Sequence, residues 1–407
     1  MMDDAKSSRQ SSSPRLVSLE HHRPFSSRAG KEDAQGLHVT SFGCEAVSEL
    51  EPRALGLTYW FDTAAQGDPY RVMIRFAGHR IGVNGAPGPR DSFNRIESIE
   101  NVLPGCGPIA VTTRVVGITP GEWQVTAAPV SEPRSRSSVE HAAPARLPRV
   151  ARASASGHTE YAPLVQVCAP GVHLGAWPAF VGIGALVGFA TQGMLATHHH
   201  LHIFAVLLVS LAASLVGLVG AKAYYLTEQY LAGHRGAQRP AILEPGMCIQ
   251  GFVIGAVATL ILGALLFGLS VGHVLDVTTP GLFLAMAIGR FGCFFGGCCV
   301  GRPTTSRWGV WSSDRHLGVR RVPTQIVESA LALLVALVTL AAAWGTTPKP
   351  SGVPFVGAVA IYTLGRQLLF PLRDHPRNTS YGRILTMALA SLVFIVAIDV
   401  AFFVEGR

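Results

Sequence analysis

The 407-residue chain is 49% hydrophobic and only 14% charged, with a formal net charge of +8 at pH 7. Soluble proteins usually carry about 25% charged residues, so this composition excludes an ordinary soluble enzyme. The apolar residues are concentrated after residue 170, and the chain before it has a soluble character. The positive charge is typical of contact with anionic lipid. We expect no nucleic-acid partner, because the arginines lie in short loops between apolar stretches.

The first part of the chain divides into three segments by composition. Residues 1–37 are rich in Ser, Arg and His, and we expect a disordered tail without the apolar core of a signal peptide. Residues 38–130 predict a small soluble all-β domain, similar to a β-sandwich, and residues 131–174 predict a linker, since 131–160 is rich in Ser, Pro, Ala and Arg. The clearest predicted strands are 57–61, 70–76 and 121–127. The second and third alternate, which predicts one face with Tyr70, Val72, Ile74 and Phe76 and another with Trp123, Val125 and Ala127. No catalytic constellation marks this domain, so we expect a binding or spacer module whose partner is unknown.

Seven apolar stretches follow, each close to the ~20 residues that span a bilayer. They predict a polytopic α-helical membrane protein over residues 175–407. An odd number of spans places the two termini on opposite sides of the membrane. The predicted spans are 175–195, 202–225, 247–269, 273–297, 323–345, 353–372 and 383–404.

The stretch 289–301 reads Gly-Arg-Phe-Gly-Cys-Phe-Phe-Gly-Gly-Cys-Cys-Val-Gly and ends the fourth span. An arginine at such depth is costly unless it is paired, solvated or bound to an anion, so Arg290 indicates a site for a negatively charged lipid headgroup. Gly289, Gly292 and Gly301 allow backbone to approach backbone or ligand closely. The alternative for Arg290, as for Arg366, is a helix-end arginine that only extends to the interface.

Other polar residues lie within the spans. Asp276 precedes Arg290 by 14 residues, which places both on one side of a helix about 21 Å apart. Gln325 and Glu328 share a helix face by their spacing of three. Arg366 and Arg373, seven apart, are predicted to share another, about 10 Å apart along the axis.

These segments resemble the bacterial prolipoprotein diacylglyceryl transferases over about residues 175–407. The stretch from Gly289 to Pro303 is similar to that family's Gly-Arg-x-Gly-Asn-Phe-x-Asn-Gly-Glu pattern, which ends in a further glycine. In the same order along the chain, Gly246–Gly251 resembles its Gly-Met-Ser-Phe-His-Gly segment, and Pro323–Glu328 its His-Pro-Ser-Gln-Leu-Tyr-Glu segment. Tyr362–Arg373 resembles the late helix that carries an essential arginine, here Arg366.

The resemblance implies a multi-pass protein of the bacterial plasma membrane that acts in lipoprotein biosynthesis. The implied reaction moves the diacylglyceryl group of phosphatidylglycerol to the lipobox cysteine thiol of a prolipoprotein, whose signal peptide is then a partner. Arg290 and Arg366 are the implied catalytic residues, and no cofactor is implied. The implied substrate-binding residues are Gly289, Gln250, Asp276, Arg290, Gly292, Gly301, Gln325, Glu328 and Arg373.

The chain departs from the family pattern where acid–base chemistry is expected. Cys293 and Cys298 replace the Asn and Glu of the signature, and Gln250 replaces a histidine. Since glutamine is no base near neutral pH, His316 and His375 are the substitutes that we consider. The alternative function is a lipid-binding or scaffold protein of the same fold that has lost catalysis.

The remaining thiols and histidines favour no metal site. Cys293, Cys298 and Cys299 have the spacing Cys-x4-Cys-Cys, which is unusual for zinc. We therefore favour small packing residues over a metal site or a disulfide and expect no metal. His198–His200 and His202 lie in a short loop, where adventitious metal binding or headgroup contact is favoured over catalysis.

The membrane orientation stays open. The loops on the N-terminal side carry most of the arginines, and the positive-inside rule places such loops in the cytoplasm. The resemblance implies the opposite, because the precursor's cysteine emerges outside the cytoplasm.

Overall fold

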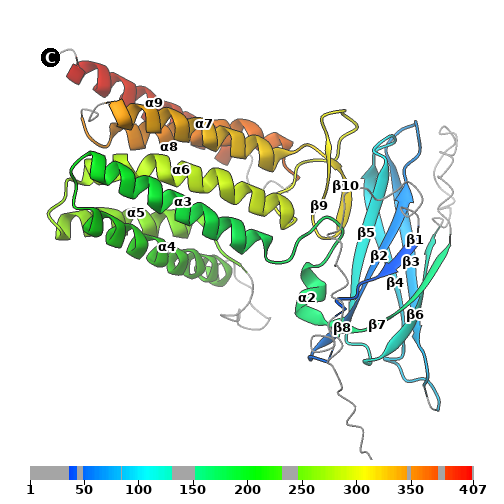
Figure 1. The fold of residues 1–407 in the computed structure, drawn as a ribbon. Coiled ribbons are helices and arrows are strands. Elements are labelled where there is room, and N and C mark those ends of the chain that lie inside the picture. Colours follow the sequence, from blue (N-terminus) through cyan, green and yellow to red (C-terminus); the bar gives the residue numbers. More distant parts are fainter. Residues whose placement is uncertain are drawn as a thin grey trace, which may run out of the picture.

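The structure is a computed structural model, and it describes residues 36–43, 49–83, 85–130, 152–231, 246–345, 350–374 and 381–405. These residues form a β-sandwich and a bundle of long helices that stand end to end (Figure 1). We call the end of the bundle that faces the sandwich the near end and the other the far end. The predicted tail at 1–37 lies almost entirely outside the described residues.

The sandwich contains two antiparallel sheets. One has the order β1 (Gly36–Val39), β2 (Arg53–Asp62), β5 (Pro108–Val116), β10 (Leu317–Arg321), β9 (Val310–Ser313), with β8 (Glu160–Tyr161) also paired to β2. The other has the order β4 (Ser92–Val102), β3 (Tyr70–Arg80), β6 (Glu122–Pro129), β7 (Ala153–His158). The expected soluble β region is therefore present, with strands wherever the sequence predicted them.

The period-2 alternation explains the core of the sandwich. Val72, Ile74 and Phe76 of β3 are buried, and Trp123 and Val125 of β6 join them in one apolar cluster between the sheets. Side chains on one face of a strand recur at every second residue, so the predicted faces of both strands are confirmed.

The predicted linker 131–174 is wrong in its second half. Residues 131–151 lie outside the described part of the chain, but β7, β8 and the helix α2 (Ala162–Val167) follow directly. The strand β7 reads Ala-Ser-Ala-Ser-Gly-His, and Ala153 and Ala155 pack against the core. Its small residues have the composition of a linker, and only pairing with β6 makes them a strand.

Seven helices are long and apolar enough to cross a membrane, as predicted. The sandwich and the end of the last helix lie at opposite ends of the molecule (Figure 1), as an odd number of spans requires. The helices are α3 (Ala176–His198), α4 (Ile203–Leu231), α5 (Ile249–Leu266), α6 (Val271–Phe295), α7 (Thr324–Gly345), α8 (Val353–Leu369) with the short 3-10 turn η1 (Phe370–Leu372), and α9 (Gly382–Glu405).

Small residues set the spacing of the central helices. A Cβ on Gly281 of α6 would lie 2.4 Å from the carbonyl oxygen of Gly188 of α3, and a Cβ on Gly188 would lie 2.9 Å from that of Gly281. Such contacts let two backbones pack directly, as membrane helices do where small residues meet. The helix α6 is thereby held against α3 and carries Arg290 at its near end.

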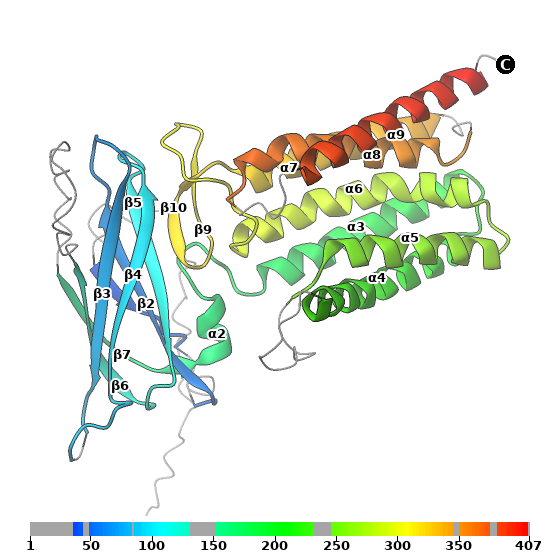
Figure 2. The same ribbon diagram turned by 180° about the vertical axis from the view of Figure 1, so that it is seen from behind.

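Residues 302–323, which we call the arm, leave the near end between α6 and α7 and complete a sheet of the sandwich (Figure 2). Leu317 pairs with Val111 and Gly318 with Ala110 across the β10–β5 ladder. Trp311 of the arm stacks on Trp60 of β2, with 5.3 Å between the ring centroids. The arm thus joins the sandwich directly to the loop that ends the 289–303 signature, which we call the signature loop (residues 296–303). The sequence did not predict this connection.

Candidate functional site

Three elements bring Arg290, Glu328 and Arg373 together at the near end. Arg290 lies in the last turns of α6, Glu328 in the first turns of α7, and Arg373 directly after η1. The Glu328 side chain is fully buried. Its Oε1 accepts a hydrogen bond from Arg373 Nε at 2.8 Å, and its Oε2 lies 3.1 Å from Arg290 Nε. The Arg290 contact is an ion pair without hydrogen-bond geometry, since Glu328 Oε2 has no hydrogen-bond partner in the described part of the chain.

Arg366 of α8 adds a third guanidinium to this group, which we call the arginine cluster (Arg290, Arg366 and Arg373). It is half-buried, repelled by Arg290 and Arg373, and attracted by Glu328. Within the described residues it makes no hydrogen bond or direct ion pair. Arg290 and Arg373 contact the one carboxylate of Glu328, and Arg366 contacts none among the described residues. Three guanidinium groups and one carboxylate therefore leave a net charge of +2. A buried excess of this size requires an anionic ligand or solvent.

Tyr362 lies one helical turn before Arg366 on α8 and belongs to the same site. Its side chain is buried, and its hydroxyl has no hydrogen-bond partner among the described residues. Residues four apart in a helix lie on one face, so the hydroxyl and the Arg366 guanidinium are presented together. A buried unpaired hydroxyl costs about 1–3 kcal/mol, and a bound ligand that accepts its hydrogen bond removes that cost.

The backbone around Arg373 is fixed by the signature loop. Gly301 and Arg373 form an isolated antiparallel bridge, and the N–H of Arg302 donates to the Leu372 carbonyl at 2.8 Å. The prediction that Arg366 and Arg373 share a helix face is wrong, because α8 ends at Leu369 and the backbone of Arg373 is extended. A bridge between distant segments places Arg373, and helical periodicity does not.

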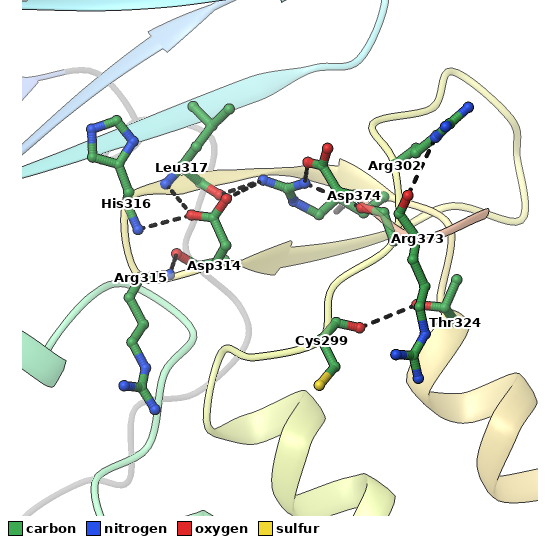
Figure 3. A network of polar contacts seen from close by, with 12 residues as sticks. Cys299, Arg302, Asp314, Arg315, His316, Leu317, Thr324, Arg373 and Asp374 are labelled. Carbon is green, nitrogen blue, oxygen red and sulfur yellow. Dashed lines mark hydrogen bonds and ion pairs between the residues drawn. The ribbon is translucent and has the colours of Figure 1, made fainter. Parts of the chain in front are cut away.

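Arg321 of β10 holds this bridge from behind. Its guanidinium is 1% exposed and donates to Asp374 at 2.5 Å, to Asp314 at 2.7 Å and to the Gly301 carbonyl at 3.1 Å. In Figure 3, Asp314 and Asp374 lie on one side of the bridge, and Arg373 and the Cys299 thiol point to the opposite side, toward the helices. Because two carboxylates compensate Arg321, it contributes no excess charge to the site.

The predicted glycines differ in their surroundings. A Cβ on Gly301 would lie 2.1 Å from the Val322 carbonyl oxygen, and one on Gly292 would lie 3.0 Å from Phe180 of α3. Both glycines are therefore required by close packing within the chain. A Cβ on Gly289 would meet nothing within 4 Å, so this position borders open space one residue before Arg290. Gln325 is buried and donates from Nε2 to the Cys298 carbonyl at 3.0 Å.

The Sγ atoms of Cys293, Cys298 and Cys299 lie within 4.8 Å of one another, and we call these residues the thiol cluster. The neighbouring thiols of Cys293 and Cys298, followed by Arg290 and Arg373, lower the pKa of Cys299 far below its ordinary value against the effect of burial. The thiols of Cys293 and Cys299 raise the pKa of Cys298, and burial adds to the rise. The thiol cluster therefore adjoins the arginine cluster.

Two predicted site residues, Asp276 and Gln250, have hydrogen-bond partners outside the arginine cluster. Asp276 is at the far end of α6, where its carboxylate accepts hydrogen bonds from the backbone N–H groups of Gly352 at 2.7 Å and Phe355 at 3.3 Å. It caps the N-terminus of α8, which carries a partial positive charge. Gln250 is exposed in the first turn of α5, and its Oε1 accepts from the Cys248 thiol.

Of the two candidate bases, His316 is in the described part of the chain. His316 of the arm lies 3.4 Å from the Glu97 carboxylate of β4, and His375 is outside the described residues. The ring nitrogens of His198 and His199 contact the Trp344 and Ala343 carbonyl oxygens at the far end, at 3.1 and 2.8 Å. Those two histidines connect the ends of α3 and α7.

Sequence reasoning missed Tyr362 and Arg321. The spacing of four between Tyr362 and Arg366 in a predicted span was a usable signal for the first. No local pattern identified Arg321, which looks like one of several loop arginines. Its burial results from the pairing of β10 with β5, which is not visible in the sequence.

Comparison with known proteins agrees with this geometry. The family described as prolipoprotein diacylglyceryl transferase matches residues 166–404. Phosphatidylglycerol–prolipoprotein diacylglyceryl transferase 2 of Clostridium perfringens is 31% identical over 188 residues, which cover 44% of this chain and 71% of that protein. The corresponding transferase of Clostridium tetani is 29% identical over 210 residues, covering 50% and 79%. The match includes every helix of the bundle and the arm, and most of the sandwich lies outside it. The chain therefore belongs to the prolipoprotein diacylglyceryl transferase family.

Proposed function

We propose that the protein transfers the diacylglyceryl group of phosphatidylglycerol to a cysteine thiol of a prolipoprotein. The observation that carries the proposal is the arginine cluster, in which Arg366 has no anionic contact among the described residues. The unpaired Tyr362 hydroxyl and the open space at Gly289 supply a hydrogen-bond donor and room beside it. The cluster lies at the end of membrane-length helices, which is the depth of a lipid headgroup.

The charge of the cluster fits the reaction. The phosphate of phosphatidylglycerol carries one negative charge, and the glycerol phosphate that leaves carries two. In the transfer the acceptor sulfur attacks the glyceryl carbon, its C–O bond to phosphate breaks, and the electron pair stays on the phosphate oxygen. Two uncompensated guanidinium charges match the charge that develops, and a planar guanidinium binds phosphate oxygens with two parallel donors. Stabilising that charge in a water-poor site lowers the barrier.

We infer different roles for the three arginines from their contacts. Arg366 is available to bind the headgroup directly. Arg290 shares Glu328 with Arg373, and Glu328 holds both guanidinium groups in place. Glu328 therefore acts as a fixed counter-ion that preorganises the donors before lipid binds.

The alternative is a membrane protein of the same fold that binds lipid without catalysis. It is favoured by Gln250, which stands where the family pattern has a histidine and lies exposed on α5. Both functions require the anion site, and only the first requires a route for the thiol proton.

The test is turnover by the full chain reconstituted in lipid vesicles. The vesicles contain phosphatidylglycerol labelled in the headgroup glycerol, and a prolipoprotein with a lipobox cysteine is the acceptor. We expect release of labelled glycerol phosphate and a matching mass increase on the acceptor, with neither for an acceptor whose cysteine is replaced by serine. Rescue of a bacterium depleted of its own transferase is the corresponding test in cells. Binding of phosphatidylglycerol without any release would establish the alternative.

A further inference from the structure

The thiol cluster has the geometry of a preorganised site. Cys293 is in the last turn of α6, and the N–H of Cys298 donates to the Cys293 carbonyl at 3.0 Å, which folds the loop back on the helix. Gln325 holds the Cys298 carbonyl at 3.0 Å, and the Thr324 hydroxyl donates to the Cys299 carbonyl at 3.4 Å. The first residues of α7 thus fix the backbone that carries two of the three thiols.

The backbone at Cys299 is unusual for a packing residue. Its φ is +55°, a left-handed conformation that costs a residue with a Cβ about 1–2 kcal/mol. Such backbone is retained mainly where a functional arrangement requires it. Here it points the Cys299 thiol toward the helices on the same side as the Arg373 guanidinium (Figure 3). Within the described ranges, no other group of three His, Cys, Asp or Glu side chains converges in this way.

We propose that Cys293, Cys298 and Cys299 bind one Zn²⁺ through three thiolates, and that its fourth position takes the acceptor thiol. Zinc–sulfur bonds of about 2.3 Å in a tetrahedral site separate the sulfur atoms by about 3.8 Å. The three Sγ atoms already lie within 4.8 Å of one another, so small side-chain rotations bring them to this separation. Three protein ligands with one open position are the pattern of catalytic zinc. The role of the metal in transfer rests on the proposed function, whereas the metal site itself does not.

The surrounding charge favours thiolate ligands. Three thiolates and one Zn²⁺ carry a net charge of −1, and Arg290 and Arg373 lie close enough to stabilise it. With the metal bound, the excess of the arginine cluster falls from two positive charges to one, which matches the single negative charge of the phosphatidylglycerol phosphate. The spacing Cys-x4-Cys-Cys is unusual for zinc, and the sequence therefore did not favour a metal. That spacing would separate the thiols in an extended chain. In the structure the loop folds back and brings all three thiols together.

A zinc ion here supplies the step that Gln250 cannot perform. A thiol that coordinates zinc loses its proton, which passes to water. The zinc-bound sulfur then attacks the glyceryl carbon, a C–S bond forms, the C–O bond to phosphate breaks, and glycerol phosphate leaves with the electron pair beside the arginine cluster. The thioether product is neutral and a weak ligand, so it dissociates from the metal.

The experiment measures metal and not only activity. The full chain is purified in detergent, freed of metal with a chelator, and titrated with Zn²⁺ against a competing zinc dye, and elemental analysis gives the zinc content. We expect one Zn²⁺ per chain. Co²⁺ in its place should give a sulfur-to-cobalt charge-transfer absorption.

Matched variants locate the site. Loss of a residue that only supports a metal ligand weakens metal binding by roughly 10–100-fold. Gln325→Ala should weaken zinc binding by this amount, and Cys293→Ser and Cys298→Ser should each weaken it by more. Cys248→Ser, at the residue directly before α5, should bind zinc like the unchanged protein. Comparing thermal unfolding of the metal-free variants identifies any that do not fold.

Two results would overturn the inference. One is a chain that binds no stoichiometric zinc, or in which the thiol cluster is isolated as a disulfide. The other is zinc retained by both cysteine variants. Turnover by a zinc-free chain would refute the role of the metal in transfer and leave the proposed function intact. Zinc binding without any turnover would refute the proposed function and leave the metal site intact.

Discussion

The two ends of the helix bundle both contain polar groups, but they satisfy them differently. At the far end the Asp276 carboxylate accepts two backbone N–H groups of α8, and the His198 and His199 rings contact carbonyl oxygens at the end of α7. At the near end Arg290 and Arg373 share Glu328. In the described part of the chain, Arg366 has no anionic contact and the Tyr362 hydroxyl has no hydrogen-bond partner.

This difference separates structural polar groups from functional ones. A buried charge that the chain itself neutralises stabilises the fold, and its removal leaves a partner unsatisfied. A buried charge in excess has no such role and indicates a ligand. Substitutions at the far end should therefore reduce the amount of folded protein, and substitutions at the near end should reduce turnover per folded molecule.

The largest effect is expected for the arginine cluster. Arg290→Ala and Arg366→Ala should each lower lipid turnover per folded protein by roughly 30- to 1000-fold, because one charge-assisted contact in a water-poor site contributes about 2–4 kcal/mol. Replacing either arginine by lysine should lower turnover per folded protein nearly as much, since lysine lacks the planar two-donor contact. Arg320→Ala, on the arm, is the control and should have little effect. Near-normal specific turnover in both Ala variants would refute the headgroup role.

Asp276→Ala should show the opposite behaviour. Two backbone N–H groups at the start of α8 lose their acceptor, so the free energy of unfolding should fall by about 1–3 kcal/mol. Turnover per folded molecule should stay close to normal. Thermal unfolding in detergent and the specific turnover of the folded fraction check both parts. A loss of turnover at unchanged stability would place Asp276 in the reaction.

Tyr362→Phe sharpens the comparison within the near end. If the hydroxyl serves bound lipid, its removal should cost about 0.5–1.5 kcal/mol, or roughly 2- to 12-fold in turnover. The lipid-free protein should be no less stable, because the variant removes a buried hydroxyl without a partner. Lower stability with unchanged turnover would show instead that the hydroxyl has a structural partner.

The smallest effect is expected where the arm meets the sandwich. Partial burial opposes ionisation of Glu97, but the hydrogen bond from Thr113, the charge of Arg95 and the contact with His316 together lower its pKa. The stabilisation is therefore present above the unfolded pKa of about 4.3 and is lost as the pH falls through the lower folded value. Glu97→Gln should lower the free energy of unfolding by up to about 1 kcal/mol at pH 7. Unfolding curves of both proteins should converge in acid, and a constant difference would contradict the assignment.

Much of the membrane domain is determined by the sequence itself. Length and apolar composition predict all seven spans, since a helix in lipid satisfies its own backbone hydrogen bonds and needs no distant partner. The depth of Arg290 and the family pattern indicate an anion site with Arg366 and Glu328. The alternation in β3 and β6 likewise predicts their buried faces, because it is a local property.

Only the tertiary structure decides how these parts are used. It makes strands of the Ala-Ser repeat at 153–158 and of the arm, because a strand is completed by a partner distant in the sequence. It neutralises Asp276 and Arg321 while leaving Arg366 without an anionic contact among the described residues. It also gathers three thiols whose spacing alone favoured no metal. Hydropathy and spacing describe each residue by its neighbours in the chain, whereas charge balance and ligand geometry depend on which segments meet in space.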